Sequence, residues 1–171
     1  MADTSGLSVR EAHASDAESI AQVQVRAWRE TYSGVLADQY FSAAALLRRT
    51  QFWSRYLSLE PKPGRVVIAE SGGEAVGFAN SGAAHGPDAE HGFPPVRPLH
   101  LFSIYLLATA QRSGLGQSML DAVLGDAPAQ LWVLRGNDRA IAFYARNGFV
   151  ADGVQYVDDS DPTLVELRMI R

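Results

Sequence analysis

The chain contains no cysteine, which excludes disulfide bonds, thiolate metal ligands and a cysteine nucleophile. It has no uninterrupted apolar run near the roughly 18 residues that a membrane span requires. Residues 1–6 lack the basic and apolar parts of a secretory signal. We therefore expect a cytoplasmic protein that does not bind membranes.

The chain also lacks a large charge of either sign. Its net charge of −4 argues against a nucleic-acid-binding surface and mildly favours cationic acceptors such as amines. It has no internal repeats and no low-complexity tracts. Its 171 residues, of which 47% are hydrophobic, suffice for one core, so one domain is expected.

The central part of the sequence has the pattern of a strand, a glycine turn and a helix. Residues 99–107 are apolar, residues 111–116 read Gln-Arg-Ser-Gly-Leu-Gly, and residues 117–124 have helical periodicity. Because Gly114 and Gly116 lack a Cβ atom, the backbone can approach an anion and adopt positive φ, while the first N–H groups of the helix point to the same place. This pattern predicts a phosphate cradle, by which we mean residues 111–116. The alternative is an ordinary turn.

A second strand and helix follow, and together the two segments carry a resemblance. Residues 131–134 are apolar, and the next helix is closed by Gly148. Residues 111–116 match Gln/Arg-x-x-Gly-x-Gly/Ala, and residues 137–149 match Asn-x-x-Ala-x-x-Phe-Tyr-x-x-x-Gly-Phe. In these motifs, their order and their separation, the chain resembles the GCN5-related N-acetyltransferase (GNAT) family.

The remaining elements complete a mixed α/β order. We expect strands at residues 8–12, 65–70, 75–81, 153–157 and 164–170, helices at residues 15–28 and 42–57, and a long surface loop at residues 82–98. A capping box is predicted at residues 15–18. The mixed order suggests a twisted sheet with helices on both faces. The resemblance implies a GNAT-like acyl-CoA N-acyltransferase fold with a mostly antiparallel central sheet, a flexible N-terminus at residues 1–6 and a single N-acetyltransferase domain at residues 7–171.

The resemblance also implies acetyl-CoA as cosubstrate, without a metal. The pantetheine arm would pair with the backbone between two splayed strands, a form of β-augmentation, and the pyrophosphate would lie on the cradle. The residues expected to bind the coenzyme are Ile104, Leu106, Gln111, Arg112, Ser113, Gly114, Leu115, Gly116, Asn137 and Tyr144.

Two residues are candidates for proton transfer. The phenol of Tyr144 has an ordinary pKa of about 10, which roughly matches a leaving thiol, so this residue is the candidate general acid; packing of the helix is the alternative. Many relatives carry Glu where this chain has His100, so His100 is the candidate general base. A structural role for His100, or proton removal by ordered waters, is the alternative. Asn137 is either a helix N-cap or a coenzyme contact.

The acceptor side is less defined by the sequence. Trp28 and Tyr32 match a Trp-x-x-x-Tyr-x-Gly arrangement that walls the acceptor pocket in many relatives, although helical spacing equally explains them as packing residues. Phe93, in the long loop, is expected at the acceptor entrance. His85, Asp88, Glu90 and His91 have metal-ligand side chains, but a flexible loop without cysteine does not favour a metal site.

The sequence therefore predicts an N-acetyltransferase that moves an acetyl group from acetyl-CoA to a primary amine by direct attack in a ternary complex. The acceptor is a small-molecule or peptide amine, and the variable N-terminal third decides which. A non-catalytic acyl-CoA-binding sensor or scaffold module is the alternative. A domain for another nucleotide is disfavoured because the chain has no Gly-Lys-Ser/Thr phosphate loop. The oligomeric state is left open, with a homodimer among the alternatives.

Overall fold

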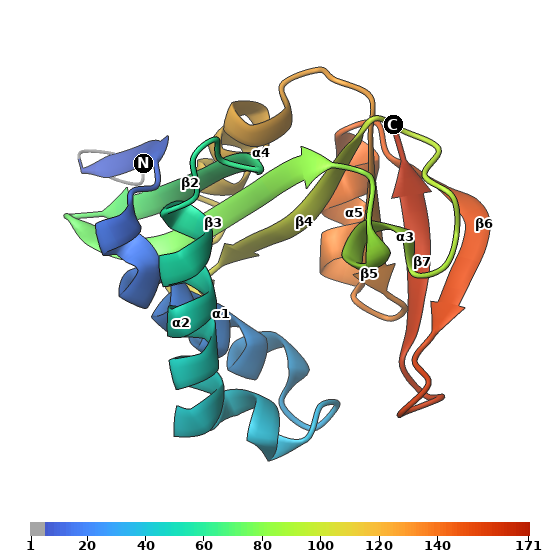
Figure 1. The fold of residues 1–171 in the computed structure, drawn as a ribbon, viewed down its shortest axis with the longest axis horizontal. Coiled ribbons are helices and arrows are strands. Elements are labelled where there is room, and N and C mark those ends of the chain that lie inside the picture. Colours follow the sequence, from blue (N-terminus) through green and yellow to red (C-terminus); the bar gives the residue numbers. More distant parts are fainter. Residues whose placement is uncertain (1–5) are drawn as a thin grey trace. The chain divides into compact units, whose positions relative to one another are not determined.

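The computed structural model describes residues 6–171, apart from the side chains of Pro87 and Asp88, and it divides into two compact units (Figure 1). The first unit comprises residues 6–80 and 103–125, and the second comprises residues 81–102 and 126–171. Of the expected flexible N-terminus, only Gly6 lies within the described residues. The single N-acetyltransferase domain over residues 7–171 stays a prediction.

The first unit is built from strands and helices that follow the predicted order closely. Its elements are β1 (Leu7–Glu11), α1 (Ala17–Tyr32), α2 (Ala43–Leu57), β2 (Gly64–Ser71), most of β3 (Glu74–Ala83), the second half of β4 (Leu99–Leu106) and α4 (Leu115–Leu124). The strands lie in the order β1-β2-β3-β4, and β1 is antiparallel to β2 with Leu7 opposite Ser71. Helix α2 begins after Ser42, whose Oγ accepts a hydrogen bond from the Ala45 N–H at 3.2 Å.

Both faces of this part of the sheet are covered. Four successive β2 residues, Val66 to Ala69, are buried, although successive strand side chains point to opposite faces. Val66 and Ile68 belong to the core formed with α1 and α2, which includes Ile20 and Trp53. Helix α4 packs on β1 and β2, and its residues Met119 and Leu120 are buried. The start of α4 is therefore supported by a rigid sheet.

The beginning of α1 corrects the predicted capping box. The box at residues 15–18 is wrong, because Ala14–Asp16 form a short 3₁₀ helix and α1 begins at Ala17. The Asp16 carboxylate accepts a hydrogen bond from the His13 N–H at 2.8 Å and two from the Arg10 guanidinium at 2.8 and 2.9 Å. The Arg10 contacts lower the pKa of Asp16. The Asp16 carboxylate thus caps the preceding 3₁₀ turn at His13 and pairs with Arg10, instead of belonging to a box that opens at Ser15.

The second unit contains the remaining elements. These are the ends of β3 and β4 at residues 81–83 and 99–102, α3 (Pro87–Glu90), β5 (Ala129–Leu134), α5 (Asp138–Arg146), β6 (Val150–Val157) and β7 (Val165–Ile170). Strand β4 is parallel to β5, and the order continues as β5-β7-β6 with antiparallel pairing. The predicted loop at residues 82–98 contains the one-turn helix α3.

The predicted fold class is confirmed. Seven strands form a mixed, mostly antiparallel sheet that is flanked by helices, in the element order expected from the sequence. Between Gly6 and Arg171, none of the helices has the length and apolar character that crossing a membrane would require.

Candidate functional site

The turn between β4 and α4 has the geometry of an anion site. Gly114 occupies the N-cap position of α4 with φ 91, and a glycine has no side chain with which to cap the helix. Arg112 also takes positive φ, at 63. The N–H groups of Gly116 and Gln117 lie in the first turn, where the helix itself supplies no acceptor. The turn therefore exposes backbone donors and the positive end of the helix dipole.

The two glycines of the cradle differ in their backbone conformation, although the sequence predicted the same freedom for both. Gly114 uses its freedom to adopt positive φ, and a Cβ built on it would meet nothing within 4 Å. Gly116 is the second residue of α4, so it needs no unusual dihedral angles. Its lack of a side chain serves only close approach to the backbone.

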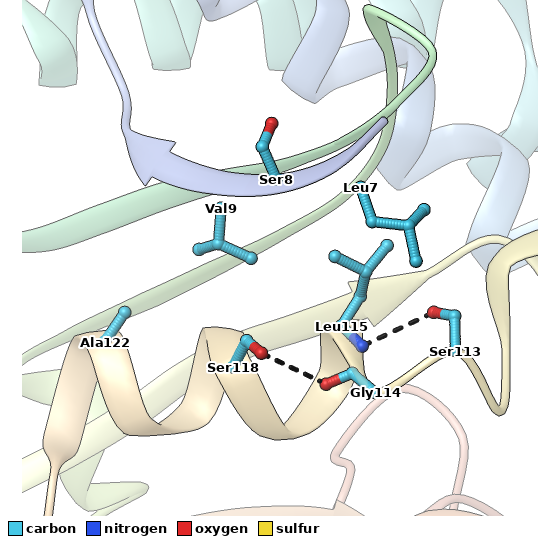
Figure 2. Close-up of a pocket in the computed structure, with 8 residues that line it drawn as sticks. All are labelled: Leu7, Ser8, Val9, Ser113, Gly114, Leu115, Ser118 and Ala122. Carbon is cyan, nitrogen blue, oxygen red and sulfur yellow. Dashed lines mark hydrogen bonds between the residues drawn. The ribbon is translucent and has the colours of Figure 1, made fainter. Parts of the chain in front are cut away.

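A pocket adjoins the cradle on the β1 side of α4 (Figure 2). It has a volume of about 520 Å³ and is lined by Leu7, Ser8, Val9, Ser113, Gly114, Leu115, Ser118 and Ala122. The Ser113 hydroxyl donates to the Ala110 carbonyl at 2.6 Å and accepts a longer bond, 3.4 Å, from the Leu115 N–H. The first turn of α4 is thus accessible, and Ser113 partly satisfies one of its donors.

The end of β4 presents one backbone edge to β3 and the other away from it. The Leu107 N–H donates to the Val76 carbonyl at 2.8 Å. Because backbone groups alternate in direction along an antiparallel strand, the N–H and C=O of Ile104 and Leu106 face away from β3. The Gln111 Nε2 group donates to the Leu106 carbonyl at 3.4 Å. The backbone groups predicted to pair with pantetheine therefore lie on the edge of β4 that faces away from β3, and the pairing itself stays a prediction.

The pairing between β4 and β5 is short. Within the described residues, it consists of Leu99 with Ala129 and His100 with Gln130, at the first residues of both strands. Among the described residues the two strands then continue without a further β4–β5 pair, and Leu131 pairs with Met169 of β7 instead. An early end to pairing is what the resemblance implies for a sheet that accepts an extended ligand.

Helix α5 begins differently from α4. Asn137 is its N-cap residue, and the side-chain Oδ1 accepts a hydrogen bond from the Ala140 N–H at 3.3 Å. The structure thus supplies the local role expected for Asn137, and a coenzyme contact stays a prediction. Tyr144 is buried, and its ring makes edge contacts with Phe143 at 5.6 Å and Phe149 at 5.9 Å. These contacts hold the phenol in a fixed position.

His100 lies in a buried environment. The residue is 3% exposed, its ring centroid lies 4.6 Å from that of Phe102, and its Nδ1 atom is buried without a hydrogen-bond partner. Burial, and to a smaller extent the charge of His91, lowers the pKa of His100 to about 4. The imidazole is neutral at pH 7 but is a weak base, because a good proton acceptor has a pKa near the working pH.

Trp28 and Tyr32 lie in a cluster of aromatic rings in the first unit. The Trp28 ring lies 5.9 Å from Tyr32, 6.3 Å from Tyr40 and 6.2 Å from Tyr105 of β4. The Arg49 guanidinium stacks over the Trp28 ring at 4.4 Å. The predicted acceptor residues therefore adjoin the strand that carries Ile104 and Leu106.

In the second unit, Phe93 lies 5.9 Å from Trp132. Its expected position at the acceptor entrance stays a prediction. Nearby, His91 stacks on Tyr156 at 4.1 Å and pairs with Glu166 at 3.1 Å. Across the described side chains, no group of three or more histidine, aspartate or glutamate residues is arranged to hold a metal ion.

The predicted site residues are thus distributed over both units. The first unit brings together the cradle, Ile104, Leu106 and the pair Trp28 and Tyr32. His100, Asn137, Tyr144 and Phe93 belong to the second unit.

Sequence reasoning missed two contacts of the site region. The Glu30 carboxylate accepts a hydrogen bond from the Ala108 N–H at 2.8 Å, which ties α1 to the turn after β4. The buried Gln130 side chain accepts from the Val96 N–H at 2.9 Å and donates to the Ala89 carbonyl at 3.2 Å, which fastens the loop at residues 82–98. A glutamine within an apolar strand was the available signal for the second contact.

Comparison with known proteins follows this geometry. The chain is 29% identical over 155 residues to Probable N-acetyltransferase Rv2775 of Mycobacterium tuberculosis, covering 87% of this chain and 83% of that protein. Its fold is similar to PaiA N-acetyltransferase from Thermoplasma acidophilum in complex with coenzyme A, with a TM-score of 0.66, 18% identity, and coverage of 95% and 98%. It is also similar to YncA from Salmonella typhimurium with acetyl-CoA, with a TM-score of 0.68, 18% identity, and coverage of 97% and 93%.

These structural relatives share the fold of this chain, and a family model gives its class. The family described as Acetyltransferase (GNAT) family matches residues 21–149, which is most of the chain. The protein belongs to the GNAT family, and the predicted family is confirmed.

Proposed function

We propose that the protein transfers an acetyl group from acetyl-CoA to a primary amine in a ternary complex. The observation that carries this proposal is the start of α4, where Gly114 at φ 91 has no capping side chain and the Gly116 and Gln117 N–H groups stay open. An anion such as the coenzyme pyrophosphate binds favourably at such a position. The two coenzyme-bound structural relatives support the choice of ligand.

In this proposal the coenzyme is held by backbone groups. Residues 111–116 bind the pyrophosphate, and the Arg112 guanidinium adds an ion pair. Ile104 and Leu106, whose backbone groups face away from β3, pair with the amides of the pantetheine arm. Gln111 releases the long hydrogen bond to the Leu106 carbonyl when a better donor arrives.

The reaction itself needs no covalent enzyme intermediate. The neutral amine nitrogen attacks the thioester carbonyl carbon, the C–N bond forms and the C–S bond breaks. The leaving thiolate takes a proton from the phenol of Tyr144, and the nitrogen loses a proton. A backbone N–H near Leu106 polarises the carbonyl. Trp28 and Tyr32, with Phe93, line the path of the acceptor.

Removal of the amine proton has two candidate routes. The low pKa and burial of His100 favour the route in which solvent or ordered water accepts the proton. The variant His100→Ala separates the two routes. If His100 is the base, the acidic limb of the pH dependence of kcat/KM disappears in the variant; a retained limb assigns the proton to water or to the amine itself.

The first test is thermal unfolding with CoA, acetyl-CoA and ATP. A ligand present at about 100 times its Kd adds roughly 2.7 kcal/mol to the free energy of unfolding, which raises the Tm by several degrees. We expect a shift with both CoA compounds and none with ATP. Absence of any shift would remove the coenzyme site. A shift with acetyl-CoA, but no release of free CoA from it when amines are added, would favour the non-catalytic acyl-CoA module.

A further inference from the structure

The layer formed by α1 and α2 has a charge opposite to that of the whole chain. Residues 17–57 contain five arginines, at positions 26, 29, 48, 49 and 55, and three acids, Glu18, Glu30 and Asp38, which gives 5 − 3 = +2. The complete chain carries −4. The part of the protein next to the predicted acceptor residues is therefore positive, although the overall charge mildly favours cationic acceptors.

One of these arginines is held in a binding geometry without a counter-ion. The Arg49 side chain is half-buried, stacks on Trp28 at 4.4 Å and donates from Nη1 to the Tyr40 carbonyl at 2.9 Å. In the described part of the chain no carboxylate pairs with it, and its Nε and Nη2 groups have no hydrogen-bond partner. By contrast, Arg10 and Arg168 each pair with an acid.

The free edge of Arg49 matches one kind of ligand. Nε–H and Nη2–H are parallel donors, which bind the two oxygens of a carboxylate at once. The same cluster holds a second donor without a partner, the buried Trp28 Nε1. Leaving the buried Trp28 N–H without an acceptor costs free energy. The half-buried Arg49 edge favours a carboxylate through its charge and its two parallel donors.

We propose that Arg49 binds a carboxylate of the acceptor, so that the amine acetylated by this protein belongs to an amino acid rather than to a polyamine. This inference rests on the proposed function. Stacking on Trp28 and the bond to Tyr40 fix the guanidinium, which leaves the Nε and Nη2 donors oriented before the ligand arrives. The rings of Trp28 and Tyr40 supply apolar contacts beside the carboxylate.

The test compares acceptors that differ only in the carboxylate. Acetyl transfer is measured with the standard amino acids, with their amides, and with the corresponding decarboxylated amines. We expect the wild-type protein to use at least one amino acid with a KM about 10- to 100-fold lower than that of its amide or decarboxylated amine, the range of one charged hydrogen-bonded contact. Equal KM values, or use of the amines alone, would overturn the inference.

Variants of two adjacent arginines assign the effect to one side chain. Arg49→Gln should remove the preference by raising KM for the amino acid, with little change for the decarboxylated amine. Arg49→Lys should restore part of it, because lysine keeps the charge but not the paired donors. Arg48→Gln, which removes the same charge from an exposed neighbour, should leave the preference unchanged. A preference that survives in Arg49→Gln contradicts the proposal.

Thermal unfolding with acetyl-CoA is measured on each variant. A protein that does not bind acetyl-CoA refutes the proposed function itself. A protein that binds acetyl-CoA and acetylates amines without regard to a carboxylate refutes only the role of Arg49. If Arg49→Gln does not fold, the comparison between Arg49→Lys and wild type on the same acceptor pairs decides, and an unchanged preference would overturn the role of the paired donors.

Discussion

Two helices of this protein follow an apolar strand, but their first turns differ in one respect. Helix α5 starts at Asn137, whose side chain occupies the Ala140 N–H, whereas α4 starts at Gly114, which has no side chain to offer. The α5 cap therefore accepts one N–H of the first turn, while in α4 only the Leu115 N–H finds a side-chain acceptor, Ser113 Oγ at 3.4 Å. The Gly116 and Gln117 N–H groups of α4 have no cap, so the comparison teaches how the choice of N-cap residue leaves backbone donors open at the proposed coenzyme site.

The largest effect is expected from a substitution of Gly114, the N-cap residue of α4. We expect Gly114→Val to lower the affinity for CoA by at least about 100-fold, because a β-branched residue is strained at φ 91 and its side chain stands before the open N–H groups. Isothermal titration with CoA measures the loss. An unchanged affinity would remove the cradle from the coenzyme site.

The hairpin between β2 and β3 offers a matched control. Gly73 also has positive φ, at 85, and a Cβ built on it would meet nothing within 4 Å. Gly73→Val should therefore lose a similar amount of stability and keep its affinity for CoA. A loss of affinity in this control would mean that strain alone explains the Gly114 result.

On the capped helix α5, the next largest effect is expected from a substitution of Tyr144, which changes turnover rather than CoA affinity. We expect Tyr144→Phe to reduce kcat by about 10- to 100-fold with little change in CoA affinity, because the proton donor is lost while the buried ring remains. Steady-state kinetics and titration with CoA separate the two quantities. Tyr56→Phe removes a hydroxyl that lies 3.4 Å from Asn80 and serves as the control. Equal turnover in Tyr144→Phe and wild type would leave Tyr144 with a packing role.

His100 predicts an effect of pH on stability. Between about pH 4 and pH 6.5 the unfolded chain binds a proton at His100 that the folded protein does not, because burial lowers the folded pKa to about 4. The free energy of unfolding should therefore rise with pH across this window, by on the order of 3 kcal/mol, and not above it.

Urea denaturation of wild type and His100→Gln at pH 4.5 and pH 7.5 measures this contribution. Acidic residues with lowered pKa values, such as Asp16, contribute to both proteins equally. The difference in pH dependence between the two proteins isolates His100. The same dependence in both would mean that the imidazole is protonated in the folded state.

The smallest effect concerns the cap of α5. Asn137→Ala should reduce the free energy of unfolding by about 1 kcal/mol, because the Ala140 N–H loses its acceptor. Asn137→Ser should retain most of the stability. Chemical denaturation and CoA titration test the cap, and we expect the CoA affinity to stay within about twofold. A clear loss of affinity in Asn137→Ala would give this residue a coenzyme contact as well.

The fold was predictable where local chemistry decides it. Ser42 caps α2, as expected for a serine that precedes a helical pattern. The strands before Gly114 and Asn137 lie where their apolar residues predicted them. The start of α1 was mispredicted, because Asp16 was assigned to a box with Ser15, whereas its carboxylate accepts the His13 N–H and pairs with Arg10 of β1.

The site was predictable in its backbone and less so in its side chains. The glycine at the start of the helix indicated the positive φ of Gly114, but the positive φ of Arg112 has no signal in the residue type. His100 looked like a candidate base because of its alignment to a motif, and its burial depends on how the surrounding strands pack. Arg49 was not singled out, because the absence of a paired acid becomes visible only in the folded structure.

The buried amide of Gln130 has a consequence for how this protein can change over generations. Gln130 holds the loop at residues 82–98 only through main-chain atoms, the carbonyl of Ala89 and the N–H groups of Val96 and Arg97. Main-chain atoms are the same in every residue type except for the missing N–H of proline. Replacement of Val96 or Arg97 by any residue except proline therefore leaves the N–H groups that Gln130 binds in place.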